Sequence, residues 1–149
     1  MWNDDYREML CALRDADVDF ILVGAYALAA HGFPRATLDI DLWVRPSPDN
    51  AQRICRALTA FGAPSSQIAA GDFEKADMVV QIGVAPRRID LITSITGVSY
   101  DEAACNAIAR EIDGVPVRIL SAEDFVRNKL AAGRPKDLAD AELLQKRAQ

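Results

Sequence analysis

Hydrophobic positions along the chain recur with helical and strand periods in alternation. An amphipathic helix is predicted over residues 3–16, behind Asn3 as a plausible N-cap. Its apolar stripe consists of Tyr6, Met9, Leu10 and Leu13. Two short apolar runs, 19–23 and 38–44, have the composition of buried strands, and an alanine-rich segment over residues 25–30 predicts a short helix between them.

The rest of the chain continues this alternation. The pattern predicts a helix over 47–62, a loop over 63–75, strands over 78–82 and 88–92, a helix from 99 to about 110, a strand over 115–120 and two closing helices separated by Gly133. No linker, repeat or low-complexity tract divides the sequence. We therefore expect one domain over residues 1–149, of the α/β or α+β class, with helices packed on a mixed sheet.

Carboxylates interrupt two of the apolar strands. Because alternate residues of a strand face the same side, Asp39 and Asp41 should project together, while Ile40 and Leu42 enter the core. Two like charges held close together are costly unless a proton or a cation lies between them. Oxygen ligands of this kind suit Mg²⁺ or Mn²⁺, and Asp90 on a second strand could supply a third.

A glycine turn precedes the first carboxylate strand. Gly24 lets the chain pass sharply from strand to helix, and the small Ala25 leaves room for close approach to the backbone. The backbone N–H groups at the start of a helix suit phosphate oxygens. Turn and carboxylates together predict a site for a metal-bound nucleoside triphosphate (NTP).

These residues resemble a known group. The segments Val23-Gly-Ala-Tyr-Ala-Leu-Ala-Ala-His-Gly32 and Arg35-Ala-Thr-Leu-Asp-Ile-Asp41, followed by Asp90, are similar to the DNA polymerase beta-like nucleotidyltransferase superfamily, and more closely to small bacterial nucleotidyltransferases related to abortive-infection and toxin-antitoxin systems. The basic and acidic segment 129–140 has a counterpart in that group. The resemblance implies the nucleotidyltransferase fold and metal-dependent transfer of a nucleoside monophosphate (NMP) from an NTP to a hydroxyl. It also implies that Asp39, Asp41 and Asp90 are the catalytic metal ligands.

Several further residues have two interpretations each. Lys129 lies in the middle of an apolar helix face, so its ammonium group either extends to solvent or reaches the nucleotide phosphates. Arg35 and Thr37 flank the carboxylate strand and could contact phosphate, although a solvated arginine is the plain alternative. Asp90 could be neutralised by Arg87 or Arg88 as a surface pair. The charges at Arg134, Lys136, Asp137 and Asp140 could be ordinary helix-surface pairs.

Composition and charge limit the partners. The net charge of -5 excludes a general basic field, so any nucleic-acid contact must be local. No apolar run is long enough to span a bilayer, and the first residues lack the features of a signal peptide, so a cytoplasmic protein without a membrane partner is expected. The acceptor is open among transfer RNA, a protein hydroxyl and a small molecule, and a cognate toxin or antitoxin is a further candidate partner.

Two other functions fit the same residues. The fold could persist as a non-catalytic binding protein, such as an antitoxin or a regulatory partner. Alternatively, the metal site could hydrolyse phosphodiesters, with water in place of the acceptor hydroxyl.

Overall fold

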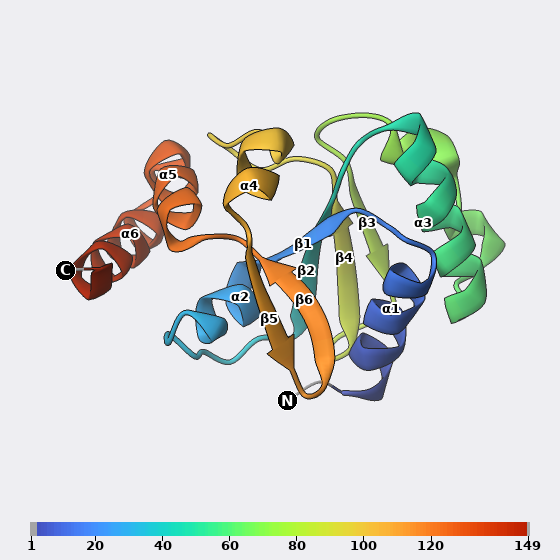
Figure 1. Cartoon of the computed structure of the whole chain (residues 1–149), viewed down its shortest axis with the longest axis horizontal. Helices are drawn as coiled ribbons and strands as arrows, with labels where there is room; N and C mark the ends of the chain where they lie inside the picture. Colours follow the sequence, from blue (N-terminus) through green and yellow to red (C-terminus); the bar gives the residue numbers. More distant parts are fainter. Residues whose placement is uncertain (1–2, 149) are drawn as a thin grey trace.

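One six-stranded mixed sheet organises the protein, whose computed structural model describes residues 3–148. The strands lie in the order β3-β4-β2-β1-β6-β5 (Figure 1). They are β1 Phe20–Val23, β2 Asp39–Val44, β3 Val79–Ile82, β4 Arg88–Ile92, β5 Ile108–Ile112 and β6 Val115–Ile119. The helices are α1 Asp4–Asp15, α2 Gly24–Ala30, α3 Pro48–Phe61, α4 Tyr100–Asn106, α5 Ala122–Ala132 and α6 Pro135–Ala148, with 3-10 turns at Ser65–Gln67 and Ala70–Phe73. The predicted mixed α/β class is confirmed.

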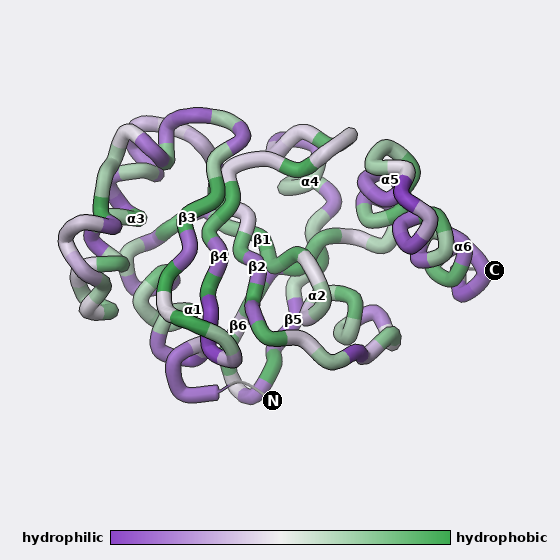
Figure 2. Tube along the Cα trace, turned by 180° about the vertical axis from the view of Figure 1, so that it is seen from behind, coloured by the Kyte–Doolittle hydropathy of each residue, from purple (hydrophilic) through white to green (hydrophobic). Residues whose placement is uncertain are grey.

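The central strands supply the core and carry the candidate carboxylates. β2 pairs with β1 in antiparallel fashion and with β4 in parallel. Ile40 and Leu42 are almost fully buried, whereas Asp39 and Asp41, which face the other side of the strand, are partly exposed. In Figure 2 hydrophilic stretches interrupt the hydrophobic course of β2 and β4. The polar positions therefore gather on one side of two neighbouring strands.

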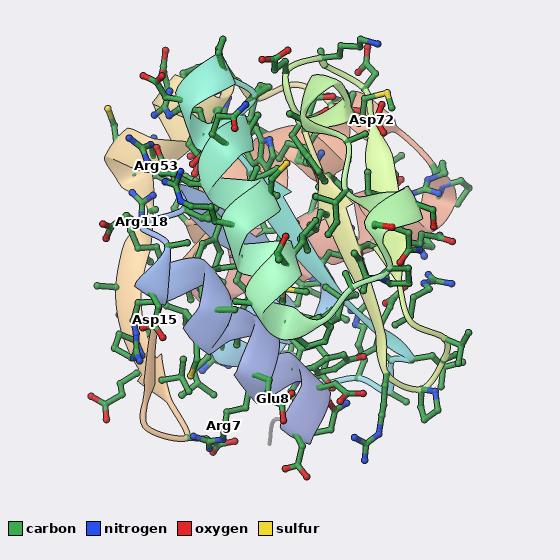
Figure 3. The ribbon with its side chains drawn as sticks, turned by 90° about the vertical axis from the view of Figure 1, so that its right-hand side faces the viewer. Arg7, Glu8, Asp15, Arg53, Asp72 and Arg118 are labelled. Atoms are coloured by element: carbon green, nitrogen blue, oxygen red, sulfur yellow. The ribbon has the colours of Figure 1, made fainter. Side chains whose placement is uncertain are left out.

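Helices cover the sheet unevenly. Figure 3 looks onto α1 and α3, which lie side by side and direct Glu8 and Asp15 of α1 to solvent. Each of the two helices begins at a side-chain cap, because Asn3 accepts a hydrogen bond from the Tyr6 N–H and Ser47 accepts one from the Asn50 N–H. The pair formed by α5 and α6 lies at the opposite side of the molecule (Figure 1).

None of the helices within residues 3–148 combines the length and the apolar character needed to cross a membrane.

One predicted element is wrong. The helix expected to reach about residue 110 ends at Asn106, and residues 108–112 form β5, joined to β6 by a turn at Asp113 and Gly114. The backbone leaves the helix at Ala107, whose ψ of 143° is extended. Ile108 and Ile112 are spaced like the face of a helix, but they pair with Ile119 and Val115 of β6. Pairing along the sheet overrides the local pattern.

Candidate active site

Three carboxylates meet on the exposed side of β2 and β4. Asp41 of β2 lies directly opposite Asp90 of β4 in the parallel pairing, and Asp39 lies two residues before Asp41 on β2, opposite Arg88. One carboxylate oxygen from each of Asp39, Asp41 and Asp90 lies within 4.8 Å of the others. Asp90 is 6 % exposed, so it forms the floor of the cluster, while the two β2 carboxylates are more accessible.

The negative charges of the three carboxylates repel one another. Burial, followed by the negative charges of Asp39 and Asp90, raises the pKa of Asp41 from its ordinary 3.8 to about 7. The pKa of Asp90 is also raised, mainly by burial. A divalent cation relieves the same repulsion, and three carboxylate oxygens at this spacing are the hard donor set that Mg²⁺ or Mn²⁺ takes. The residues present therefore fit such an ion.

Two neighbouring side chains support the cluster. The Arg88 guanidinium donates from Nε to Asp90 Oδ1 at 3.1 Å, and its Nη2 contacts both Asp90 and Asp39. The Thr37 hydroxyl donates to Asp39 Oδ1 at 3.0 Å, so Thr37 contacts a carboxylate strand residue directly. The sequence offered Arg88 only as a counter-ion of Asp90. Its second contact, with Asp39, depends on the strand register and has no local signal.

The Gly24 turn touches the cluster from the adjacent strand. Gly24 has φ of +72°, a left-handed conformation that favours glycine, and it starts α2. A Cβ atom at this position would lie 2.2 Å from Asp41 Oδ2. A side chain at position 24 would therefore occupy the space of the Asp41 carboxylate, so only glycine fits there.

Two hollows adjoin Asp41 of the carboxylate cluster, and both are also lined by Gly24 and Lys129. The first, about 220 Å³, has a polar lining: Gly24, Ala25, Leu28, Arg35, Asp41, Lys129, Lys136 and Asp140. The second, about 280 Å³, is more apolar: Val23, Gly24, Asp41, Ile92, Ile95, Leu120, Phe125, Asn128, Lys129 and Arg134. Of the predicted nucleotide-binding residues, Gly24, Ala25, Arg35 and Lys129 thus lie together, whereas Thr37 lies beside Asp39.

Lys129 is held in place by two carboxylates of α6. Its ammonium nitrogen lies 3.6 Å from Asp137 and 3.8 Å from Asp140, and the side chain is only 16 % exposed. Asp137 also pairs with Arg134 at 2.6 Å, and Asp140 with Arg35 at 3.0 Å.

The surface interpretation of the two α6 carboxylates is wrong. Asp137 is fully buried, and Asp140 is 7 % exposed. Their spacing of three residues, continued by the buried Ala141 and Leu144, places them on one helix face. That spacing was the available signal in the sequence.

A larger hollow lies elsewhere. About 450 Å³ in volume, it lies at the other end of β1, between the end of α1 and the β5–β6 hairpin. Of its two carboxylates, Asp19 is already paired with Arg45 and Arg118. The carboxylate cluster is the stronger candidate because it alone among the described residues gathers three acidic groups that could hold a metal ion.

Comparison with known proteins identifies a family. Residues 2–148 match a family model described as a nucleotidyl transferase of unknown function (DUF2204). Among curated proteins, none matches the chain.

Solved structures share the fold at low sequence identity. TM1012 from Thermotoga maritima, provisionally named a nucleotidyltransferase, is 17% identical, with a TM-score of 0.63 over 99% of this chain and 95% of that one. The antibiotic-resistance factor ANT(2'')-Ia is 15% identical in its solution structure, with a TM-score of 0.58 over 97% of this chain and 83% of that one. Its crystal structure with adenylyl-2''-tobramycin is 17% identical, with a TM-score of 0.57 over 97% and 87% of the respective chains. The match of the family model over nearly the whole chain, on a sheet of this topology, places the protein in the DUF2204 nucleotidyl transferase family.

Proposed function

We propose that the protein is a metal-dependent nucleotidyltransferase that moves an NMP from an NTP to a hydroxyl acceptor. One observation carries the proposal: the oxygens of Asp39, Asp41 and Asp90 lie within 4.8 Å of one another, beside a hollow that Arg35 and Lys129 line. Carboxylates that gather a cation next to basic groups for phosphate are what phosphoryl-group chemistry requires.

In this proposal, each part of the site has a separate task. Asp39, Asp41 and Asp90 would hold Mg²⁺ or Mn²⁺. When bound, the cation supplies neutralising charge for the phosphates and lowers the pKa of the attacking hydroxyl. Arg35 and Lys129 bind the phosphate oxygens, and Gly24 with Ala25 lets the phosphates approach the backbone.

The transfer step balances in atoms and charge. The acceptor oxygen forms a bond to the α-phosphorus, the bond from that phosphorus to the bridging oxygen of the β-phosphate breaks, and pyrophosphate leaves. The acceptor proton passes to the Asp90 carboxylate, which takes this role in addition to that of a metal ligand.

The acceptor and the biological setting are part of the proposal. The acceptor is an RNA, a protein or a small molecule, and the setting is a toxin-antitoxin or phage-defence system, on the strength of the sequence resemblance. ANT(2'')-Ia was solved with an adenylylated aminoglycoside, so aminoglycosides belong among the small molecules tested.

Transfer of label from NTPs carrying a labelled α-phosphate tests the proposal. Wild-type protein with Mg²⁺ is offered transfer RNA, lysate proteins and aminoglycosides, and labelled product should appear together with pyrophosphate. Asp39→Asn and Asp41→Asn should abolish transfer, because each removes a charged metal ligand. Asp15→Asn, an equal charge change on α1, should leave transfer unchanged.

The outcomes separate the candidate functions. Normal transfer by Asp41→Asn contradicts the proposed roles of the carboxylates. Absence of both transfer and NTP binding in the wild type favours a non-catalytic binding protein. Release of NMP from nucleic acid without any NTP requirement favours phosphodiester hydrolysis.

A further inference from the structure

Arg88 occupies the space between the carboxylates of two strands. It is the first residue of β4 and lies directly opposite Asp39 in the parallel pairing. Its guanidinium donates two hydrogen bonds to Asp90, from Nε to Oδ1 at 3.1 Å and from Nη2 to Oδ2 at 3.3 Å. The same Nη2 also donates to Asp39 Oδ2. One nitrogen thus bridges two carboxylates that belong to the candidate metal ligands.

Arg88 also supplies the positive charge of this cluster. Among residues 3–148, no other cationic side chain forms an ion pair with Asp39, Asp41 or Asp90. Arginine is well suited to the task, because its planar group offers several donors in a fixed arrangement. Without it, three carboxylates would lie together with no cationic partner among the described residues.

Arg88 occupies oxygens of two of the three candidate metal ligands. Asp39 Oδ2 and both Asp90 oxygens accept from the guanidinium. Two cations that share the same oxygens also repel each other at short range. The Arg88 side chain is 34% exposed and has a long flexible stem, so it has a path to solvent.

From this arrangement we infer that Arg88 is an internal counter-cation, which holds the acidic cluster together without metal and which an incoming divalent cation displaces. The inference rests on the proposed function, because it takes Asp39, Asp41 and Asp90 as metal ligands. Arg88 would therefore set the metal affinity of the site by competition. Metal loading would also free a guanidinium beside the bound phosphates.

Titration with Mn²⁺ tests this competition without any substrate. Free Mn²⁺ is followed by its electron paramagnetic resonance signal in wild type, Arg88→Gln and Arg87→Gln. Arg88→Gln should bind Mn²⁺ about tenfold more tightly, because a competing positive charge is removed.

Arg87→Gln is the matched control. It removes the same charge from the residue before Arg88, and Arg87 pairs with Asp5 at 3.6 Å and not with the cluster. Its Mn²⁺ affinity should stay within about twofold of wild type, because exposed charges at greater distance are screened.

Thermal unfolding gives a second readout. In EDTA, Arg88→Gln should unfold at a lower temperature than wild type, because the carboxylates then repel each other unopposed. Excess Mn²⁺ should restore its stability. Arg88→Lys keeps the charge, but its ammonium group lacks the planar set of donors that lets a guanidinium bind both carboxylates at once. It should therefore compete less strongly, with an Mn²⁺ affinity between those of wild type and Arg88→Gln.

Equal or weaker Mn²⁺ binding by Arg88→Gln, relative to wild type that binds Mn²⁺, overturns the inference and leaves the proposed function standing. Should Arg88→Gln fail to fold, an Arg88→Lys variant with wild-type affinity overturns it as well. Absence of Mn²⁺ binding in wild type and in all variants removes both the inference and the metal site of the proposed function.

Discussion

At the scale of single residues, the site is defined by charges that the fold forces together. Asp41 illustrates the cost, because burial and the two neighbouring carboxylates raise its pKa to about 7. Its location was predictable, since alternation along a strand places Asp39 and Asp41 on one side. Asp90 was predicted as a third ligand on a second strand, but its position opposite Asp41 and the bridging contacts of Arg88 depend on the pairing of β2 with β4.

The raised pKa of Asp41 predicts a specific dependence of stability on pH. Without metal, the folded protein binds more protons at Asp41 than the unfolded chain does between about pH 4 and pH 7, so the free energy of unfolding falls as pH rises through this range. Asp41→Asn removes this contribution. In EDTA, thermal unfolding should therefore show Asp41→Asn becoming more stable relative to wild type from pH 4 to pH 8. A difference that is constant with pH, or that shrinks, contradicts this origin of the shift.

At the scale of elements, the turn from β1 into α2 fixes the position of Asp41. Gly24 is required there by conformation and by space together, since its φ is +72° and a Cβ would meet Asp41 Oδ2. The sequence indicated the turn because a strand pattern ends at glycine before a helix. It did not indicate that the turn packs against a carboxylate.

Gly24→Ala should therefore reduce both the stability of the fold and metal binding, whereas backbone strain by itself reduces only stability. Left-handed strain costs roughly 1–2 kcal/mol for any residue with a Cβ, and the displaced Asp41 should also abolish Mn²⁺ binding. Gly62→Ala is the matched control, because Gly62 has φ of +94° and nothing within 4 Å of its Cβ position. Urea unfolding should show a loss in both variants, while Mn²⁺ titration should fail only in Gly24→Ala. Normal Mn²⁺ binding by Gly24→Ala would show that the contact with Asp41 is unimportant.

At the scale of the whole molecule, the site joins the sheet to the pair formed by α5 and α6. The protein has a net charge of -5, yet Arg35, Lys129, Arg134 and Lys136 gather around the two hollows. Lys129 reaches the sheet because Asp137 and Asp140 hold it from the next helix. Basic side chains beside an acidic cluster suit a triphosphate that carries a metal ion, because they attract its phosphates while the carboxylates attract the metal.

Sequence reasoning recovered most elements because their local signals agree with their tertiary surroundings. The strands with apolar runs and the capped helices are examples. It missed β5, where Ile108 and Ile112 fit a helix face as well as a strand. It offered Asp137 and Asp140 as surface charges, yet both are buried: Asp137 pairs with the nearby Arg134 and with Lys129 of α5, and Asp140 pairs with Arg35. The pair of Arg35 with Asp140, which are 105 residues apart, is invisible in a local window.

Lys129→Met should separate phosphate binding from metal binding. Loss of a charged hydrogen-bond donor should weaken NTP binding about tenfold, while Mn²⁺ affinity without nucleotide stays unchanged. Asp137 and Asp140 keep Arg134 and Arg35 as partners, which favours an intact fold. Lys146→Met, which removes an exposed lysine paired with Glu142, is the control and should bind NTP normally. Equal weakening in both variants would point to overall charge and not to the site.

The most direct test of a metal-dependent nucleotide site is a calorimetric titration of the four ribonucleoside triphosphates into wild type and Asp41→Asn, with and without Mg²⁺. Binding of at least one triphosphate by the wild type is predicted, with a requirement for Mg²⁺ and with loss of binding in Asp41→Asn. Nucleotide binding that is the same without Mg²⁺, or the same in Asp41→Asn, would contradict the site, as would a wild type that binds none of the four.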